Sequence, residues 1–131
     1  MSKRFAGRRI LVVEDEYLLA QCLADLLQNE GAQVLGPASC MEDADALLDG
    51  SPLPDAAVLD INLGNQNVYP LADRLADGHV PLLFTSGYDR ELVPVRHADS
   101  PRCAKPFGVD QVRTQLLALL DVGADAGADV R

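Results

Sequence analysis

Short apolar runs alternate along this chain with longer stretches whose apolar residues recur every three or four positions. The runs lie at residues 10–13, 33–36, 56–59, 80–85 and, more weakly, 102–104. Runs that are apolar on both faces are typical of strands in a parallel sheet, and the intervening pattern is typical of amphipathic helices. The alternation therefore predicts an α/β fold, in which helices cover both faces of a doubly wound, five-stranded parallel sheet.

The predicted helices differ in how clearly the sequence marks them. Four are expected, at residues 17–28, 41–48, 70–76 and 109–120. Between the fourth and fifth strands, Pro94 interrupts a segment that has no helical period, so we expect a short or irregular fourth helix. Gly, Ala and Asp then repeat after Leu120. We expect one folded domain over residues 7–121 and a disordered tail over 122–131.

Composition narrows the class of protein. The 131 residues carry 11 Lys and Arg against 20 Asp and Glu, a net charge of −9, which argues against nucleic-acid or anionic-membrane partners. No apolar run approaches the roughly 20 residues of a membrane span, and the N-terminus does not resemble a signal peptide. Cys22, Cys40 and Cys103 are odd in number and widely spaced, so we expect small core residues in a reducing cytoplasm.

Polar residues follow the predicted strands at the edge of the sheet where ligands bind in such folds. Each one alone is typical of a turn or a helix cap. Together they would place three carboxylates, a hydroxyl and an ammonium around one crevice. These residues are Glu14, Asp15, Asp60, Thr85 or Ser86, and Lys105.

Converging carboxylates repel one another unless a cation lies between them, and Mg²⁺ suits such ligands. The arrangement is consistent with Asp60 acting as a nucleophile that becomes an aspartyl phosphate. Glu14 and Asp15 would then position the metal, while Ser86 and Lys105 would hold the phosphoryl oxygens. An ionised carboxylate is already nucleophilic, so this chemistry needs no general base.

Three blocks of the sequence, at residues 12–16, 59–63 and 104–107, resemble the signature blocks of a response-regulator receiver domain of the CheY-like type. The resemblance covers about residues 7–121. It implies a sheet of order 2-1-3-4-5 with five helices, Asp60 as phosphoacceptor and Lys105 as the phosphate-contacting lysine. It also implies that Glu14 and Asp15 form the acidic pair, and that the backbone carbonyl of Asn62 completes the protein ligands of Mg²⁺ or Mn²⁺.

The phosphate-contacting hydroxyl is either Thr85 or Ser86, because strand alternation turns only one of them into the site. Family spacing from Pro81 selects Ser86, with Thr85 as the alternative. Residues 81–88 also resemble the signature of the "FAT GUY" receivers, a single-domain alphaproteobacterial group. The shared residues are Pro81, Phe84, Gly87 and Tyr88, and Asn62 to Gly64 also fits. This narrower resemblance implies a partner histidine kinase of the HWE type.

One position departs from ordinary receivers. The aromatic switch residue usually lies three positions before the lysine, where this chain has Arg102. Our hypothesis is that phosphorylation orders residues 87–94 as Ser86 closes on the phosphoryl group. Tyr88 then either replaces the moving aromatic ring or is simply packed. Glu16, beside the acidic pair, either tunes hydrolysis or is an ordinary acidic residue in the first turn of a helix.

The predicted function is a stand-alone receiver that accepts a phosphoryl group on Asp60 from a histidine kinase or phosphotransfer protein. It would signal through protein contacts or act as a phosphate sink, as a monomer or weak dimer, with no enzymatic activity beyond its own phosphorylation and dephosphorylation. The alternative is a pseudo-receiver that only binds proteins. An Asp-nucleophile phosphatase would need a second Asp after Asp60, and a dinucleotide module would need a glycine-rich first turn. His79 and His97 are expected on the surface.

Overall fold

A computed structural model describes residues 4–64, 66–87 and 93–129, with side chains described as far as residue 120. Within these residues, five parallel strands form one sheet of order β2-β1-β3-β6-β7. The strands are β1 (Arg9–Val13), β2 (Gln33–Ala38), β3 (Ala56–Asp60), β6 (Leu82–Ser86) and β7 (Arg102–Ala104). This is the predicted order, so the fold class is confirmed, including the weak fifth strand.

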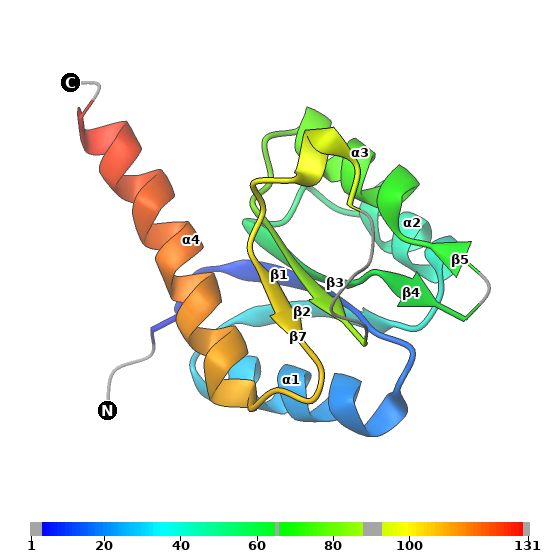
Figure 1. Ribbon diagram of the computed structural model, residues 1–131. Helices are drawn as coiled ribbons and strands as arrows, with labels where there is room; N and C mark the ends of the chain where they lie inside the picture. Colours follow the sequence, from blue (N-terminus) through cyan, green and yellow to red (C-terminus); the bar gives the residue numbers. More distant parts are fainter. Residues whose placement is uncertain (1–3, 65, 88–92, 130–131) are drawn as a thin grey trace.

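The helices cover the two faces of the sheet in pairs (Figure 1). On one face lie α1 (Tyr17–Asn29) and α4 (Val109–Asp129); on the other lie α2 (Met41–Asp49) and α3 (Tyr69–Asp77). Strand alternation divides the core accordingly, because Ile10 and Val12 belong to the α1–α4 cluster, whereas Leu11 and Val13 belong to the α2–α3 cluster. The two buried layers hold the strands in register and bring their carboxyl ends to one edge.

In the crossover before β7, the described residues 93–101 agree with the expected short or irregular fourth helix. They contain one 3₁₀ turn, η1 (Val95–His97), which follows Pro94. After β3, the short strands β4 (Asn62–Leu63) and β5 (Gln66–Asn67) pair as a small antiparallel hairpin. Gly64 makes this turn with a φ of 61°, a conformation that residues with a Cβ rarely adopt.

The backbone of α4 continues as helix through residues 122–129. The bounds of the folded domain, residues 7–121 with a disordered tail after them, stay a prediction. Cys103 is buried as predicted, but Cys22 is exposed, because one residue step along a helix turns a side chain by about 100° from its buried neighbour Leu23. Among the described helices, none is both long and apolar enough to span a bilayer.

Candidate functional site

The carboxyl edge of the sheet brings four of the predicted site residues together. Glu14 follows β1, Asp60 ends β3 and Lys105 follows β7, while Asp15 lies next to Glu14 at the loop into α1. The side chains of Glu14 and Asp60 are only 1% and 3% exposed, and that of Lys105 is 16% exposed. We call these four residues the carboxyl-edge site.

The ammonium of Lys105 contacts three carboxylates. Its Nζ donates to Glu14 Oε2 at 3.0 Å, to Asp60 Oδ2 at 3.1 Å and to Glu16 Oε1 at 2.7 Å. Burial alone would lower the pKa of Lys105, but hydrogen bonds to Glu16, Glu14 and Asp60 outweigh it, so the pKa of Lys105 is raised and the side chain stays charged. Glu16 and Lys105 are 89 positions apart in the chain, and no sequence pattern indicated that they meet.

The surroundings of Asp60 disfavour its ionised form. Burial, followed by the hydrogen bond and charge of Glu14, raises the pKa of Asp60 to about 8, although Lys105 acts in the opposite direction. Its Oδ1 also accepts a hydrogen bond from the backbone N–H of Asn62 at 3.2 Å. The folded site therefore favours the protonated form of Asp60 more than water does, and a bound cation would oppose this shift.

The geometry fits a divalent cation. Glu14, Asp15 and Asp60 each offer a carboxylate oxygen, and these oxygens lie within 4.8 Å of one another. Among the described atoms, Glu14 Oε1 has no hydrogen-bond partner although it is buried, and such an orphaned oxygen is costly unless a ligand satisfies it. Asp15 is exposed and accepts the N–H of Gly64 at 3.1 Å, so the β4–β5 hairpin fixes its position. An all-oxygen set of this kind suits Mg²⁺ or Mn²⁺.

Comparisons with known proteins agree with this geometry. SdrG from Sphingomonas melonis Fr1 is 36% identical, with a TM-score of 0.73, and the match covers 92% of this chain and 99% of that one. A CheY-like receiver domain from Methanospirillum hungatei matches at a TM-score of 0.79 over 91% of this chain and 98% of that one, at 20% identity, which shows the fold alone. The regulator PhyR of Methylorubrum extorquens is 33% identical over 101 residues, 75% of this chain. No family model matches.

This chain belongs to the CheY-like receiver domains of response regulators. It spans about half the length, or less, of the curated relatives it matches, with 53% for PdtaR of Mycobacterium tuberculosis and 38% for PhyR. The comparisons do not test the narrower "FAT GUY" resemblance, which stays a prediction.

The receiver's two candidate hydroxyls are both buried, and each is 1% exposed. Thr85 lies opposite Asp60 in the strand register, and Ser86 lies opposite Ala104. The carbonyl of Ser86 accepts the backbone N–H of Lys105 at 2.6 Å, which ties β6 to the lysine. Within the described part of the chain, Thr85 Oγ1 has no hydrogen-bond partner. The assignment of Ser86 over Thr85 stays a prediction, as does the Asn62 carbonyl as a metal ligand.

The usual switch position of a receiver carries Arg102 here, and this side chain is exposed. Tyr88, proposed as a replacement, lies outside the described residues. A different ring is buried instead: His97 on η1 is 2% exposed, stacks on Tyr69 and meets Phe84 edge-on, with ring centroids 6.0 and 5.6 Å away. Its Nε2 lies 2.7 Å from Asp73 Oδ1. The expectation of a surface His97 was therefore wrong, whereas His79 is exposed.

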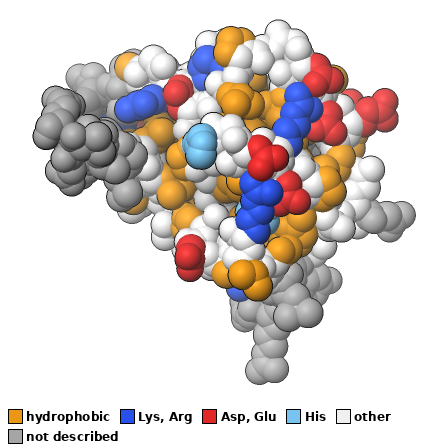
Figure 2. Space-filling model, turned by 90° about the horizontal axis from the view of Figure 1, so that it is seen from above, with side chains coloured by type: hydrophobic (Ala, Val, Ile, Leu, Met, Phe, Trp, Pro, Cys, Tyr) orange, Lys and Arg blue, Asp and Glu red, His pale blue; other side chains and the backbone are white. Residues whose placement is uncertain are grey.

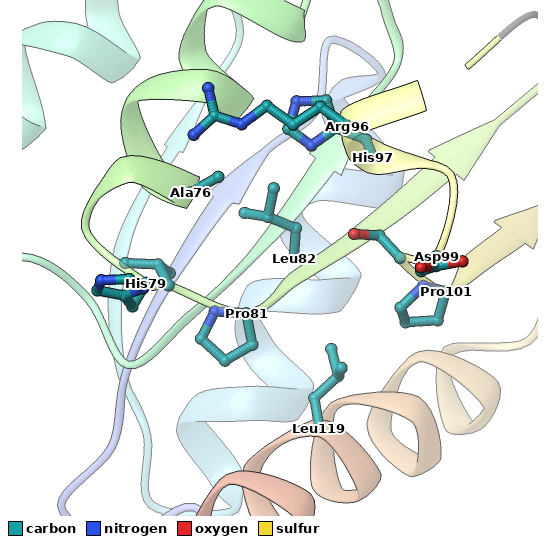
Figure 3. A pocket seen from close by; sticks show the side chains of 11 residues that line it. Ala76, His79, Pro81, Leu82, Arg96, His97, Asp99, Pro101 and Leu119 are labelled. Carbon is teal, nitrogen blue, oxygen red and sulfur yellow. The ribbon is translucent and has the colours of Figure 1, made fainter. Parts of the chain in front are cut away.

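The prediction for His97 failed because, in the 3₁₀ turn, the apolar residue faces solvent and the polar residue is buried. Val95 is 93% exposed, while the histidine two residues later is buried and finds an acidic partner on α3. His97 also lines a hollow of about 390 Å³ (Figure 3). Pro81 and Pro101, which precede β6 and β7, line the same hollow, so it lies at the edge of the sheet opposite Asp60. It is therefore separate from the carboxyl-edge site.

Proposed function

We propose that this receiver accepts a phosphoryl group on Asp60 from a histidine kinase or phosphotransfer protein, with Mg²⁺ or Mn²⁺ at the carboxyl-edge site. One observation carries the proposal: the Asp60 carboxylate is buried where the Lys105 ammonium and an acidic, cation-deficient cluster meet. The raised pKa of Asp60 supports it, because perturbed carboxyls concentrate at functional sites.

The transfer requires few protein groups. An Asp60 carboxylate oxygen attacks phosphorus, the bond from phosphorus to the donor breaks, and a donor imidazole leaves with the electron pair. A bound divalent cation supplies positive charge, which favours the ionised form of Asp60 and neutralises phosphoryl oxygens. The Lys105 ammonium and the Ser86 hydroxyl would hold the remaining oxygens. Later attack of water on phosphorus restores the carboxylate and releases phosphate, so the site can be reused.

An apolar surface beside the site suits a protein donor. Tyr17 and Leu18, at the start of α1, are each 77% exposed. A hollow of about 550 Å³ next to them is lined by apolar side chains together with Glu16, Gly87 and Lys105; the apolar residues are Leu18, Leu19, Pro106 and Phe107. We assign this surface to the histidine-bearing helices of the donor, because a partner seated there would bring its phosphohistidine to Lys105 and Asp60.

The resemblance to "FAT GUY" receivers makes an HWE-type kinase the first donor to try. The acidic net charge of −9 favours a protein partner over nucleic acid. The phosphorylated domain would act in the cytoplasm as a monomer or weak dimer. It would either bind a partner or drain phosphoryl groups from the kinase.

Intact mass after incubation with Mg²⁺ and acetyl phosphate tests the chemistry. We expect one phosphoryl adduct on the wild-type protein, none on Asp60→Asn, and none on the wild type when the metal is chelated. If neither acetyl phosphate nor a phosphorylated kinase labels the wild-type protein, the pseudo-receiver reading replaces this proposal.

The docking surface has its own test with a phosphorylated HWE-type kinase as donor. Leu18→Asp should slow transfer from the kinase by about ten-fold, the typical cost of losing an apolar anchor, and leave labelling by acetyl phosphate unchanged. Val95→Asp, on a residue that is 93% exposed outside this surface, is the matched control. Equal transfer rates for the two variants would contradict the assignment.

A further inference from the structure

The hydrogen-bonding capacity of Lys105 is fully used in the unphosphorylated receiver. An ammonium group has three N–H donors and no acceptor. Three carboxylate oxygens receive them, from Glu14, Glu16 and Asp60, at 3.0, 2.7 and 3.1 Å. Lys105 therefore has to release one of these acceptors before it can donate to a phosphoryl oxygen.

The three acceptors are not equivalent. Glu14 and Asp60 are almost completely buried, and both belong to the group of carboxylates that fits a cation. Glu16 is 61% exposed and lies outside that group, yet it makes the shortest contact with Lys105. Its own backbone N–H donates to Glu14 Oε2 at 3.1 Å, so the turn before α1 holds Glu16 beside the lysine.

Phosphorylation would change these acceptors unequally. Asp60 loses its negative charge when one of its oxygens bonds to phosphorus, and a bound cation would offset the charge of Glu14. Glu16 keeps its charge and its position, so it is the acceptor that still competes for the ammonium. We propose that Glu16 is a positioning residue that competes with the phosphoryl group for Lys105 and thereby limits the phosphorylation of Asp60. This inference rests on the proposed function.

The expected change in phosphorylation rate follows from the solvent exposure of the Glu16–Lys105 ion pair. Exposed ion pairs contribute modestly, so removing Glu16 should raise the rate of phosphorylation by roughly two- to five-fold rather than by orders of magnitude. The same removal should lengthen the lifetime of the aspartyl phosphate, because Lys105 then stays on the phosphoryl oxygens.

Four proteins test the inference: wild type, Glu16→Gln, Lys105→Met and the double variant. The initial rate of labelling by acetyl phosphate is measured for each by intact mass, at saturating Mg²⁺. We expect Glu16→Gln to raise the rate when Lys105 is present and to have no effect when Met replaces it. Glu42→Gln, the same change on an exposed residue in the first turn of α2, should match wild type.

An equal rate increase in both backgrounds would overturn the inference, since Glu16 would then only repel the anionic donor. No increase in either background would overturn it as well. Failure of the wild-type protein itself to take up phosphoryl groups would instead overturn the proposed function, and this inference with it. The two failures are distinguishable, because loss of labelling in the wild-type protein is seen before any variant is compared with it.

Discussion

Two groups of charged residues in this receiver are built in opposite ways. At the carboxyl-edge site, one ammonium serves several carboxylates, and Glu14 and Asp60 are buried. The second group joins α3 to its neighbours, and we call it the α3 ion-pair cluster. Arg74 on α3 lies 3.2 Å from Asp45 and 2.7 Å from Asp49 of α2. On η1, Arg96 pairs with Asp73 and Asp77 of α3, and His97 lies 2.7 Å from Asp73. Basic and acidic side chains lie directly against one another across the surface in Figure 2.

The difference separates a site for chemistry from a structural connection. Carboxylates at the carboxyl-edge site are close together and short of cations, so they weaken the fold until a ligand arrives. In the α3 ion-pair cluster each carboxylate has a basic neighbour, and all but His97 remain partly in water. That cluster holds the short crossover segment in place at little electrostatic cost. Substitutions in the two clusters should therefore have opposite consequences.

The largest effect should come from His97, the one buried member of the α3 ion-pair cluster. His97→Ala removes a ring packed on Tyr69 and Phe84, and it removes the contact with Asp73. We expect the free energy of unfolding to fall by about 3 kcal/mol, as for other buried rings, in urea titrations. Phosphoryl uptake of the folded variant should be unchanged.

His79→Ala provides the control, because His79 is exposed and should change stability by no more than about 0.5 kcal/mol. Loss of phosphoryl uptake in a folded His97→Ala protein would show that the two clusters are not separate.

Asp60→Asn should have the next largest effect, with the opposite sign. The pKa of Asp60 is about 8 in the folded receiver, against an ordinary value of 3.8. Between these values the unfolded chain has lost a proton that the folded protein keeps, so wild-type stability falls as pH rises from about 4 to about 8. We expect Asp60→Asn to be more stable than wild type at pH 8, without divalent cations, and this difference to shrink to nearly zero as the pH falls to 4.

Adding Mg²⁺ gives a second test of the stability difference between wild type and Asp60→Asn. It should stabilise the wild-type protein most at high pH, where the proton on Asp60 competes least, and it should stabilise Asp60→Asn much less. A stability difference between the two proteins that stays constant from pH 4 to pH 8 would contradict the raised pKa of Asp60.

The smallest effect should come from the exposed arginines. Arg74→Met and Arg96→Met each remove contacts between partly exposed groups, so the midpoint of unfolding should fall only slightly. The loss should shrink at about 1 M salt, where such pairs are screened. A loss as large as that of His97→Ala would show that charge, rather than ring packing, holds η1 on α3.

The sequence predicted the parts that depend on periodicity and strand order. Polar residues that directly follow apolar strands must meet at one edge of a parallel sheet, which is why Asp60 and Lys105 were placed together correctly. Contacts that depend on the path of a loop were missed. Glu16 reaches Lys105 because of the turn before α1, and His97 is buried because a 3₁₀ turn directs it toward Asp73. No local sequence pattern indicates that Glu16 contacts Lys105 or that His97 contacts Asp73.

The most direct test of the account is to locate the phosphoryl group. Borohydride reduces an acyl phosphate of aspartate to homoserine, which peptide mass spectrometry identifies by position. After treatment of the receiver with Mg²⁺ and acetyl phosphate, we expect homoserine at position 60 and at no other acidic residue. Reduction at Asp15, or unmodified Asp60 in protein that carries a phosphoryl adduct, would contradict the assignment of Asp60 as the phosphoacceptor.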